Sequence, residues 1–148
     1  MKFITIDGTD KSGKSSIIEG IWKETNGLVY PMDRGLSSWH FFNVLLERIP
    51  KEDKVYHKEY KQKLKAFRQL VDLSVILSVN EEDWKTRCKE AKEQPLVGNL
   101  SFEEHQKELI HYFNKARYSN VLRLYTSELS EDECVNKILA RIGYNRRK

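Results

Sequence analysis

Residues 8–15 read Gly8-Thr9-Asp10-Lys11-Ser12-Gly13-Lys14-Ser15, which completes the spacing G-x-x-x-x-G-K-S. An apolar run precedes this loop at residues 3–6, and a helical pattern follows it at residues 16–24. A strand, a glycine-rich loop and a helix in this order form the context that a phosphate-binding loop requires. The alternative is a chance glycine loop that opens a helix, but the complete motif in this context favours a P-loop.

The residue types of this loop suit the binding of a nucleoside triphosphate. Glycines permit a close approach of the backbone, whose successive N–H groups then face phosphate oxygens at the positive end of the helix dipole. We expect Lys14 to reach the β- and γ-phosphates and the Ser15 hydroxyl to ligate Mg²⁺. The predicted cofactors are therefore ATP and Mg²⁺. The predicted cofactor-binding residues are Gly8, Asp10, Ser12, Gly13, Lys14, Ser15 and Ser16.

Length and composition limit the class of protein. A chain of 148 residues suits one domain, residues 1–148, with little room for a second core. Charged residues make up 32% and hydrophobic residues 39%, as in soluble globular proteins. The net charge of +4 fits anionic ligands such as nucleotides, but it falls short of the basic footprint of a dedicated nucleic-acid binder. Cys88 and Cys134 are too few for a disulfide framework or a zinc site.

No stretch of the sequence has the features of a membrane span or a secretory leader. A span needs about 18 consecutive apolar residues, and no run approaches this length. The N-terminal apolar stretch covers only residues 3–6 and continues directly into the glycine loop. We therefore expect a cytoplasmic protein without a membrane partner.

Strands and helices alternate along the chain. We predict strands at residues 2–7, 28–32, 71–79 and 121–125, and helices at residues 16–25, 38–49, 52–68, 81–92, 102–118 and 131–142. This alternation predicts an α/β fold, namely a P-loop three-layer α/β/α sandwich with a small, mainly parallel sheet of about four strands. Pro31 lacks an N–H group, which places the second strand at the sheet edge. Ser37 or Ser38 is the expected N-cap of the next helix, with Trp39 on its buried face.

Polar residues follow the second strand at its C-terminal end. In open α/β sheets this is the edge at which ligands bind. Asp33 and Arg34 are therefore well placed for chemistry beside the P-loop. The alternative is a surface ion pair in a loop.

Basic residues are concentrated in two of the predicted helices. The helix at residues 52–68 is dense in lysine on one side, for which a solvated face is the preferred interpretation and a basic patch near the substrate the alternative. The helix that begins near Glu81 carries Lys85, Arg87, Lys89 and Lys92 close to a strand end.

Taken together, these features resemble the thymidylate kinase family of nucleoside monophosphate kinases. Residues 3–15 resemble the start of that family, in which a carboxylate precedes the first glycine and an Asp lies inside the loop. Lys11 resembles the basic residue of the eukaryotic and poxviral members, which assists phosphoryl transfer. Asp33-Arg34 with Ser37 and Ser38 resembles the segment Asp-Arg-x-x-x-Ser, whose Asp helps the metal and acceptor site and whose Arg holds the acceptor phosphate. Arg87 stands at the position of a lid Arg, and the resemblance implies a lid over residues 85–100.

The resemblance implies ATP-dependent phosphoryl transfer to a (deoxy)nucleoside monophosphate, a step of nucleotide biosynthesis. The catalytic residues that it implies are Lys11, Lys14, Asp33, Arg34 and Arg87, and the implied metal ligands are Ser15 and Asp33. Asp10 is a candidate to accept a hydrogen bond from a substrate sugar hydroxyl. The chain passes from its first helix directly into the Asp-Arg strand, without the additional strand usual in the family, so we expect a compact version of the fold.

Three alternatives stay open on the sequence alone. The first is a kinase for a nucleoside, a polynucleotide end or a modified base in DNA, in which the lysine-rich helix would contact DNA. The second is an ATP-driven motor or switch, which is less consistent because no apolar run ending in paired acidic residues follows the P-loop. The third is a nucleotide-binding regulator without catalysis. The predicted partner is a nucleotide; nucleic acid is not favoured, and a homodimer is left open.

Overall fold

The computed structural model describes residues 1–9, 11–46, 53–91 and 100–144. Within them four strands form one sheet in the order β2-β1-β3-β4, and every neighbouring pair is parallel. The strands are β1 (Lys2–Asp7), β2 (Val29–Asp33), β3 (Leu73–Ser78) and β4 (Val121–Tyr125). The helices are α1 (Lys14–Thr25), α2 (Leu36–Leu45), α3 (Lys54–Leu70), α4 (Glu81–Ala91), α5 (Phe102–Lys115) and α6 (Glu131–Arg141). The predicted α/β fold with a small parallel sheet is confirmed.

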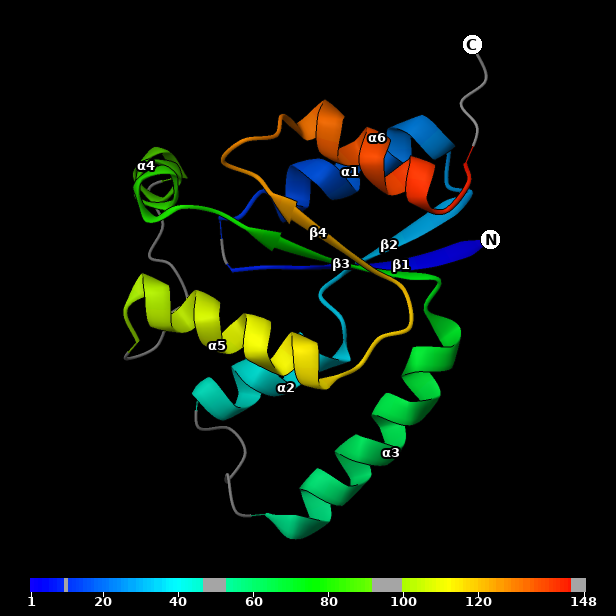
Figure 1. The fold of residues 1–148 in the computed structure, drawn as a ribbon, viewed down its shortest axis with the longest axis vertical. Helices are drawn as coiled ribbons and strands as arrows, with labels where there is room; N and C mark the ends of the chain where they lie inside the picture. The colour runs from blue at the N-terminus through cyan, green and yellow to red at the C-terminus, as the bar shows by residue number, and fades with distance from the viewer. Residues whose placement is uncertain (10, 47–52, 92–99, 145–148) are drawn as a thin grey trace.

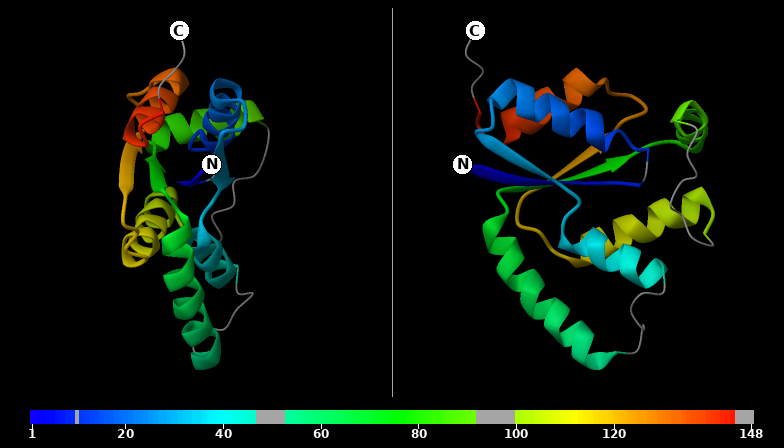
Figure 2. Two further views of the ribbon diagram at one scale, coloured as in Figure 1. Left: turned by 90° about the vertical axis from the view of Figure 1, so that its right-hand side faces the viewer. Right: turned by 180° about the vertical axis from the view of Figure 1, so that it is seen from behind.

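Helices cover both faces of the sheet (Figure 1). Helices α1 and α6 lie on one face and α2 and α5 on the other, while α4 stands beyond the end of β3. The first face buries Ile4 and Ile6 of β1 against Ile17 of α1 and Ile138 of α6. Helix α3 extends obliquely away from the sheet (Figure 2), and Leu64 is its only buried residue. These layers form the predicted α/β/α sandwich.

The order of the strands determines where a ligand can enter. Strand β2 lies at the edge, as Pro31 predicts, and β1 lies between β2 and β3. From β1 the chain crosses to β2 on one side, whereas from β3 it crosses to β4 on the other. Such a reversal opens a crevice at the carboxyl ends of the two central strands. The P-loop follows β1 and therefore lies at this crevice.

Most helix ends follow their sequence signals. Helix α1 ends at Asn26 and Gly27, which have left-handed φ angles of 51° and 81°. At the start of α4, the Asn80 side chain accepts a hydrogen bond of 2.7 Å from the Asp83 N–H. Ser130 begins α6 with a reciprocal capping box. No helix in the described part of the chain is long and apolar enough to cross a membrane.

The start of α2 differs from the prediction. Gly35 occupies the N-cap position, and Ser37 and Ser38 lie buried inside the first turn of the helix. The serine hydroxyls do not cap the helix because distant buried side chains engage them instead. Trp39 is also wrongly assigned to the buried face: it is 50% exposed, and the neighbouring Phe41 is buried.

Candidate functional site

A cleft of about 480 Å³ lies at the carboxyl edge of the sheet. Its volume falls in the range of small-molecule sites. The sequence-predicted residues that line it are Lys11, Gly13, Lys14, Ser15, Ser16, Asp33, Arg34 and Arg87. Gly8 and Ser12 are instead buried within the loop, and Asp10 lies outside the described residues. The structure thus brings the P-loop, the end of β2 and α4 to one cleft.

The backbone of the loop forms a cradle that only glycine permits. A Cβ atom on Gly8 would lie 2.5 Å from the Ser12 Oγ and 3.1 Å from the carbonyl oxygen of Leu77. Gly13 has a φ of +104°, in the region that side chains disfavour. The Ser12 N–H closes the turn on the carbonyl of Thr9 at 3.1 Å. The Ser12 hydroxyl is buried without a hydrogen-bond partner among the described residues, so the loop contains one polar group that is not hydrogen-bonded.

Lys14 places a positive charge inside this cradle. Its side chain is largely buried, and its Nζ donates to the carbonyls of Gly8 at 3.2 Å and Thr9 at 3.0 Å. The N-terminus of α1, which begins at Lys14, adds the positive end of the helix dipole at the same place. Ammonium, dipole and glycine-built concavity together fit a bound polyphosphate.

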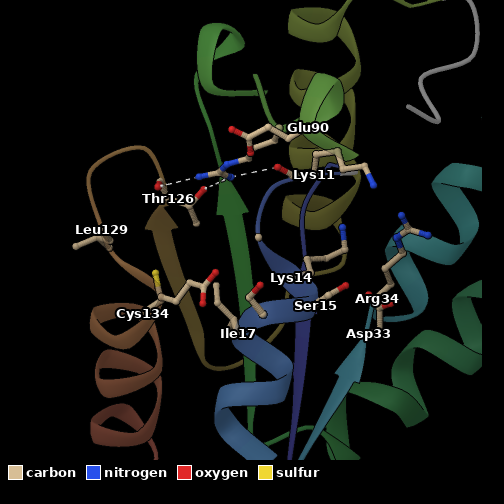
Figure 3. A pocket seen from close by; sticks show the side chains of 14 residues that line it. Lys11, Lys14, Ser15, Ile17, Asp33, Arg34, Glu90, Thr126, Leu129 and Cys134 are labelled. Carbon is tan, nitrogen blue, oxygen red and sulfur yellow. Dashed lines mark hydrogen bonds between the residues drawn. The ribbon is translucent and has the colours of Figure 1, made fainter. Parts of the chain in front are cut away.

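Asp33 and Arg34 face the P-loop from the end of β2. Asp33 is paired in register with Ile6, so the end of β2 lies beside the end of β1. The Arg34 N–H donates to the Ile6 carbonyl at 2.9 Å. Asp33 and Arg34 form no ion pair with each other. Figure 3 shows both side chains on the same side of the cleft as Lys14 and Ser15.

Arg87 fastens α4 to two loops of the cleft. Its guanidinium donates to the Lys11 carbonyl at 3.1 Å and to the hydroxyl and carbonyl of Thr126 at 3.3 Å each. The Thr126 hydroxyl in turn donates to the Ser12 carbonyl at 2.9 Å. The predicted lid arginine therefore lies at the cleft and also braces the P-loop.

The remaining lining residues are not among the predicted site residues. They are Ile17, Glu90, Thr126, Leu129, Glu131 and Cys134. Figure 3 shows Thr126, Leu129 and Cys134 across the start of α1 from Asp33 and Arg34. Burial raises the pKa of the Cys134 thiol, which is therefore a neutral part of the wall. Thr126 directly follows β4, so the strand-end rule that selected Asp33 could have selected it as well.

Asp7 is a further residue near the cleft that is not among the predicted site residues. It ends β1 and is fully buried, and its Oδ1 accepts hydrogen bonds from the Gly35 N–H at 2.8 Å and from the Ser38 hydroxyl. Burial raises the pKa of this carboxyl, while the hydrogen bonds from Ser38 and Gly35 act in the opposite direction. Its position directly before Gly8 was the available signal.

The oxygen donors of the cleft suit one class of metal ion. Ser15 and Asp33 both line it, and the described residues contain no cluster of three or more His, Cys, Asp or Glu side chains that could hold a metal. Mg²⁺ keeps several water ligands and takes one or two protein oxygens together with substrate phosphates. The donor set therefore fits a nucleotide-bound Mg²⁺.

Solved structures share this fold. The structure of deoxyadenosine kinase from M. mycoides with bound dATP matches with a TM-score of 0.63 at 15% identity, covering 95% of this chain and 99% of that chain. The structure of the M. mycoides enzyme with bound dCTP gives a TM-score of 0.61 at 14% identity, covering 97% and 100%. Shikimate kinase from Aquifex aeolicus reaches only 0.44 at 21% identity, covering 95% and 96%. No protein-family model and no curated protein sequence matches the chain. The chain therefore has the fold of the deoxyadenosine kinase structures.

Proposed function

We propose that the protein is a P-loop phosphotransferase that transfers the γ-phosphoryl group of ATP to a (deoxy)nucleoside monophosphate. The observation that supports this most is the convergence of Lys14 and Ser15 with Asp33 and Arg34 in one cleft. A P-loop alone would serve any nucleoside triphosphatase. A carboxylate and a guanidinium facing that loop add groups that can hold an acceptor.

Each residue has a role in this proposal. Phosphoryl transfer requires mainly positioning and charge neutralisation, with little covalent chemistry for the protein. Lys14 and the N–H groups at the start of α1 hold the donor phosphates. Ser15 and Asp33 would hold Mg²⁺, which would supply positive charge against the donor phosphates. Arg34 clamps the acceptor phosphate with two parallel hydrogen bonds, a geometry that arginine provides and lysine does not.

The rest of the cleft then accommodates the donor nucleoside. Leu129 and Cys134 lie across the start of α1 from the acceptor residues and form, with Ile17 of α1 itself, a largely apolar wall. A flat nucleobase fits such a wall, and Thr126 offers a polar group beside it. Lys11 and Arg87 supply further positive charge from the loop and from α4 to the transferred group.

Three parts of the proposal extend beyond the described residues. The lid at residues 85–100 is described only for residues 85–91 and 100, and Asp10 is not described. We retain the lid, the hydrogen bond that Asp10 accepts from a sugar hydroxyl and a single domain over residues 1–148 as proposals. Membership of the thymidylate kinase family is also part of the proposal, supported by Asp33-Arg34 and the serine that follows.

A nucleoside acceptor is the second candidate. Both structures of M. mycoides that share the fold are of a deoxyadenosine kinase. A nucleoside kinase needs the same donor cleft, but its acceptor has no phosphate for Arg34 to bind. The identity of the acceptor separates the two candidates.

The test incubates the purified protein with γ-labelled ATP, Mg²⁺ and a panel of nucleosides, nucleoside monophosphates and oligonucleotides. Label on a monophosphate, absent with the Lys14→Ala variant, is the expected result. Label on nucleosides alone would replace the first candidate by the second. Label on an oligonucleotide, with binding that weakens steeply as salt rises, would establish a polynucleotide kinase. Label on no acceptor would refute the kinase and leave a switch or regulator.

A further inference from the structure

We infer that Asp7 is a positioning residue for Arg34: its buried carboxylate fastens the turn between β2 and α2 to the end of β1 and thereby fixes where the Arg34 guanidinium lies. The inference rests on the proposed function, because it concerns the residue assigned there to the acceptor. It adds that a side chain outside the cleft lining determines the geometry of the acceptor end.

Two successive peptide groups are anchored to the last residues of β1. The Arg34 N–H donates to the Ile6 carbonyl at 2.9 Å, and the next N–H, that of Gly35, donates to the Asp7 Oδ1 at 2.8 Å. Asp7 is 0% exposed, so water does not compete for its oxygens. Leaving a buried donor or acceptor without its partner is costly, so these hydrogen bonds hold the turn in place. The backbone on both sides of the Arg34 Cα is therefore held by β1.

Arg34 needs such an anchor because its backbone is strained. Its φ of 69° lies in the left-handed region, which is unfavourable for a residue with a side chain. A strained conformation persists only where the surrounding structure determines it. The hydrogen bonds to Ile6 and Asp7 fix the two peptide groups that flank Arg34 and so maintain its strained conformation.

The side chain of Arg34 depends on the same anchor. Its guanidinium carbon lies 4.2 Å from the centroid of the Phe42 ring, which belongs to α2. The Ser38 hydroxyl, in the first turn of α2, donates to the Asp7 Oδ1. One carboxylate oxygen thus holds both the peptide after Arg34 and the helix that carries the supporting ring.

A separate contact holds α2 and provides a matched control. The Tyr118 and Ser37 hydroxyls share a hydrogen bond of 3.0 Å, and the Ser37 N–H lies 3.3 Å from the Tyr118 oxygen. This contact joins α2 to the segment before β4. The Tyr118 hydroxyl borders Gly35, but its hydrogen bonds go to Ser37 and not to the peptides that flank Arg34. Tyr118→Phe therefore keeps both anchors of those peptides, whereas Asp7→Ala should release Arg34.

The kinetic test compares Asp7→Ala, Ser38→Ala, Asp7→Asn and Tyr118→Phe. Asp7→Ala should raise the acceptor KM about tenfold or more and leave the ATP KM within about twofold, because misplacing a clamp weakens only the substrate that it holds. Ser38→Ala should have a smaller effect in the same direction. Asp7→Asn should restore most of the loss, because its amide oxygen can accept the Gly35 N–H. Tyr118→Phe should lower the unfolding midpoint without a selective rise in the acceptor KM.

A double-mutant cycle separates positioning from general destabilisation. In an Arg34→Ala background, Asp7→Ala should raise the acceptor KM no further, since the residue that it positions is gone. Additive effects of the two substitutions would overturn the inference. A crystal structure of Asp7→Ala tests it even if no acceptor is phosphorylated, an outcome that would refute the proposed function alone. Arg34 displaced from Phe42 supports the inference, and Arg34 unmoved overturns it.

Discussion

The Arg34 guanidinium lies over the face of the Phe42 ring, with its carbon 4.2 Å from the ring centroid. A cation over an aromatic face gains about 0.5–2 kcal/mol, depending on its exposure. The ring therefore limits the conformations of a long side chain that borders the cleft. A preorganised guanidinium loses less entropy when it binds a phosphate than a flexible one does.

Replacing the ring tests this support. Phe42→Leu keeps an apolar side chain but removes the aromatic face, so we expect the acceptor KM to rise about three- to tenfold. Phe41→Leu is the control, because Phe41 is buried beside Phe42 and shows no cation contact with Arg34. Steady-state kinetics on both variants provide the comparison. Equal rises in the acceptor KM would show that the ring acts only through the stability of α2.

The close packing around Gly8 predicts that Gly8→Ala weakens nucleotide binding. The added Cβ would lie 2.5 Å from the Ser12 Oγ and 3.1 Å from Leu77, so the loop must shift and ATP affinity should fall at least about tenfold. Gly143→Ala is the matched control: its φ is +71°, but a Cβ there would meet nothing within 4 Å. That control should lose about 1 kcal/mol of stability and no ATP affinity. Titration calorimetry with ATP and Mg²⁺ measures both affinities, and unchanged binding by Gly8→Ala would contradict the P-loop assignment.

The Thr126 hydroxyl connects the P-loop to Arg87 through hydrogen bonds. Thr126→Val preserves the shape but leaves the Ser12 carbonyl without this donor, at a cost of about 1–3 kcal/mol. We expect ATP affinity to fall, and Thr126→Ser, which keeps a hydroxyl, to stay near the wild type. The combination of Thr126→Val with Arg87→Ala should be less than additive, because the two side chains share a hydrogen bond. Full additivity would show that they act on the loop separately.

His40 predicts a loss of stability in mild acid. Burial, together with the nearby His57, lowers the pKa of His40 from 6.5 to about 4. Between these values the unfolded chain binds a proton that the folded chain does not, so stability is fully present above pH 6.5 and falls toward about pH 4. The loss should be about 2–3 kcal/mol. Burial raises the pKa of Asp7, which gives that group the opposite dependence.

Urea unfolding at several pH values measures this loss. His40→Phe should flatten the decline between pH 6.5 and 4, because no imidazole remains to be protonated. Tyr56→Phe is the control: it removes the 3.0 Å hydrogen bond between Tyr56 and His40 but leaves the buried imidazole. If the stability of His40→Phe falls with decreasing pH as steeply as that of the wild type, other groups cause the loss of stability in acid.

The fold and the phosphate end of the cleft could be predicted because their signals are local. The motif from Gly8 to Ser15 determines a strand, a turn and a helix, and Pro31 places β2 at the edge. Asp33 and Arg34 then follow from the rule that ligands bind at the carboxyl ends of strands. Nothing in their assignment required knowledge of tertiary contacts.

The contacts around α2 could not be predicted because their partners are remote. Ser38 contacts Asp7 across 31 positions of sequence, and Ser37 contacts Tyr118 across 81. A serine before a helical pattern is normally a cap, and only the folded chain shows that these hydroxyls are engaged elsewhere. The place of Cys134 in the cleft lining has a similar explanation. Cys134 lies on α6, which is remote in sequence from the P-loop but packs beside α1 in the fold.

The central claim is that Arg34 holds the acceptor phosphate, and the Arg34→Ala variant tests it most directly. We measure the KM for the monophosphate acceptor and the KM for ATP in the same preparation. The account predicts that the acceptor KM rises about 10- to 100-fold, the loss of a charge-assisted bidentate contact, while the ATP KM changes less than about threefold. Equal changes in both constants, or an unchanged acceptor KM, would contradict it.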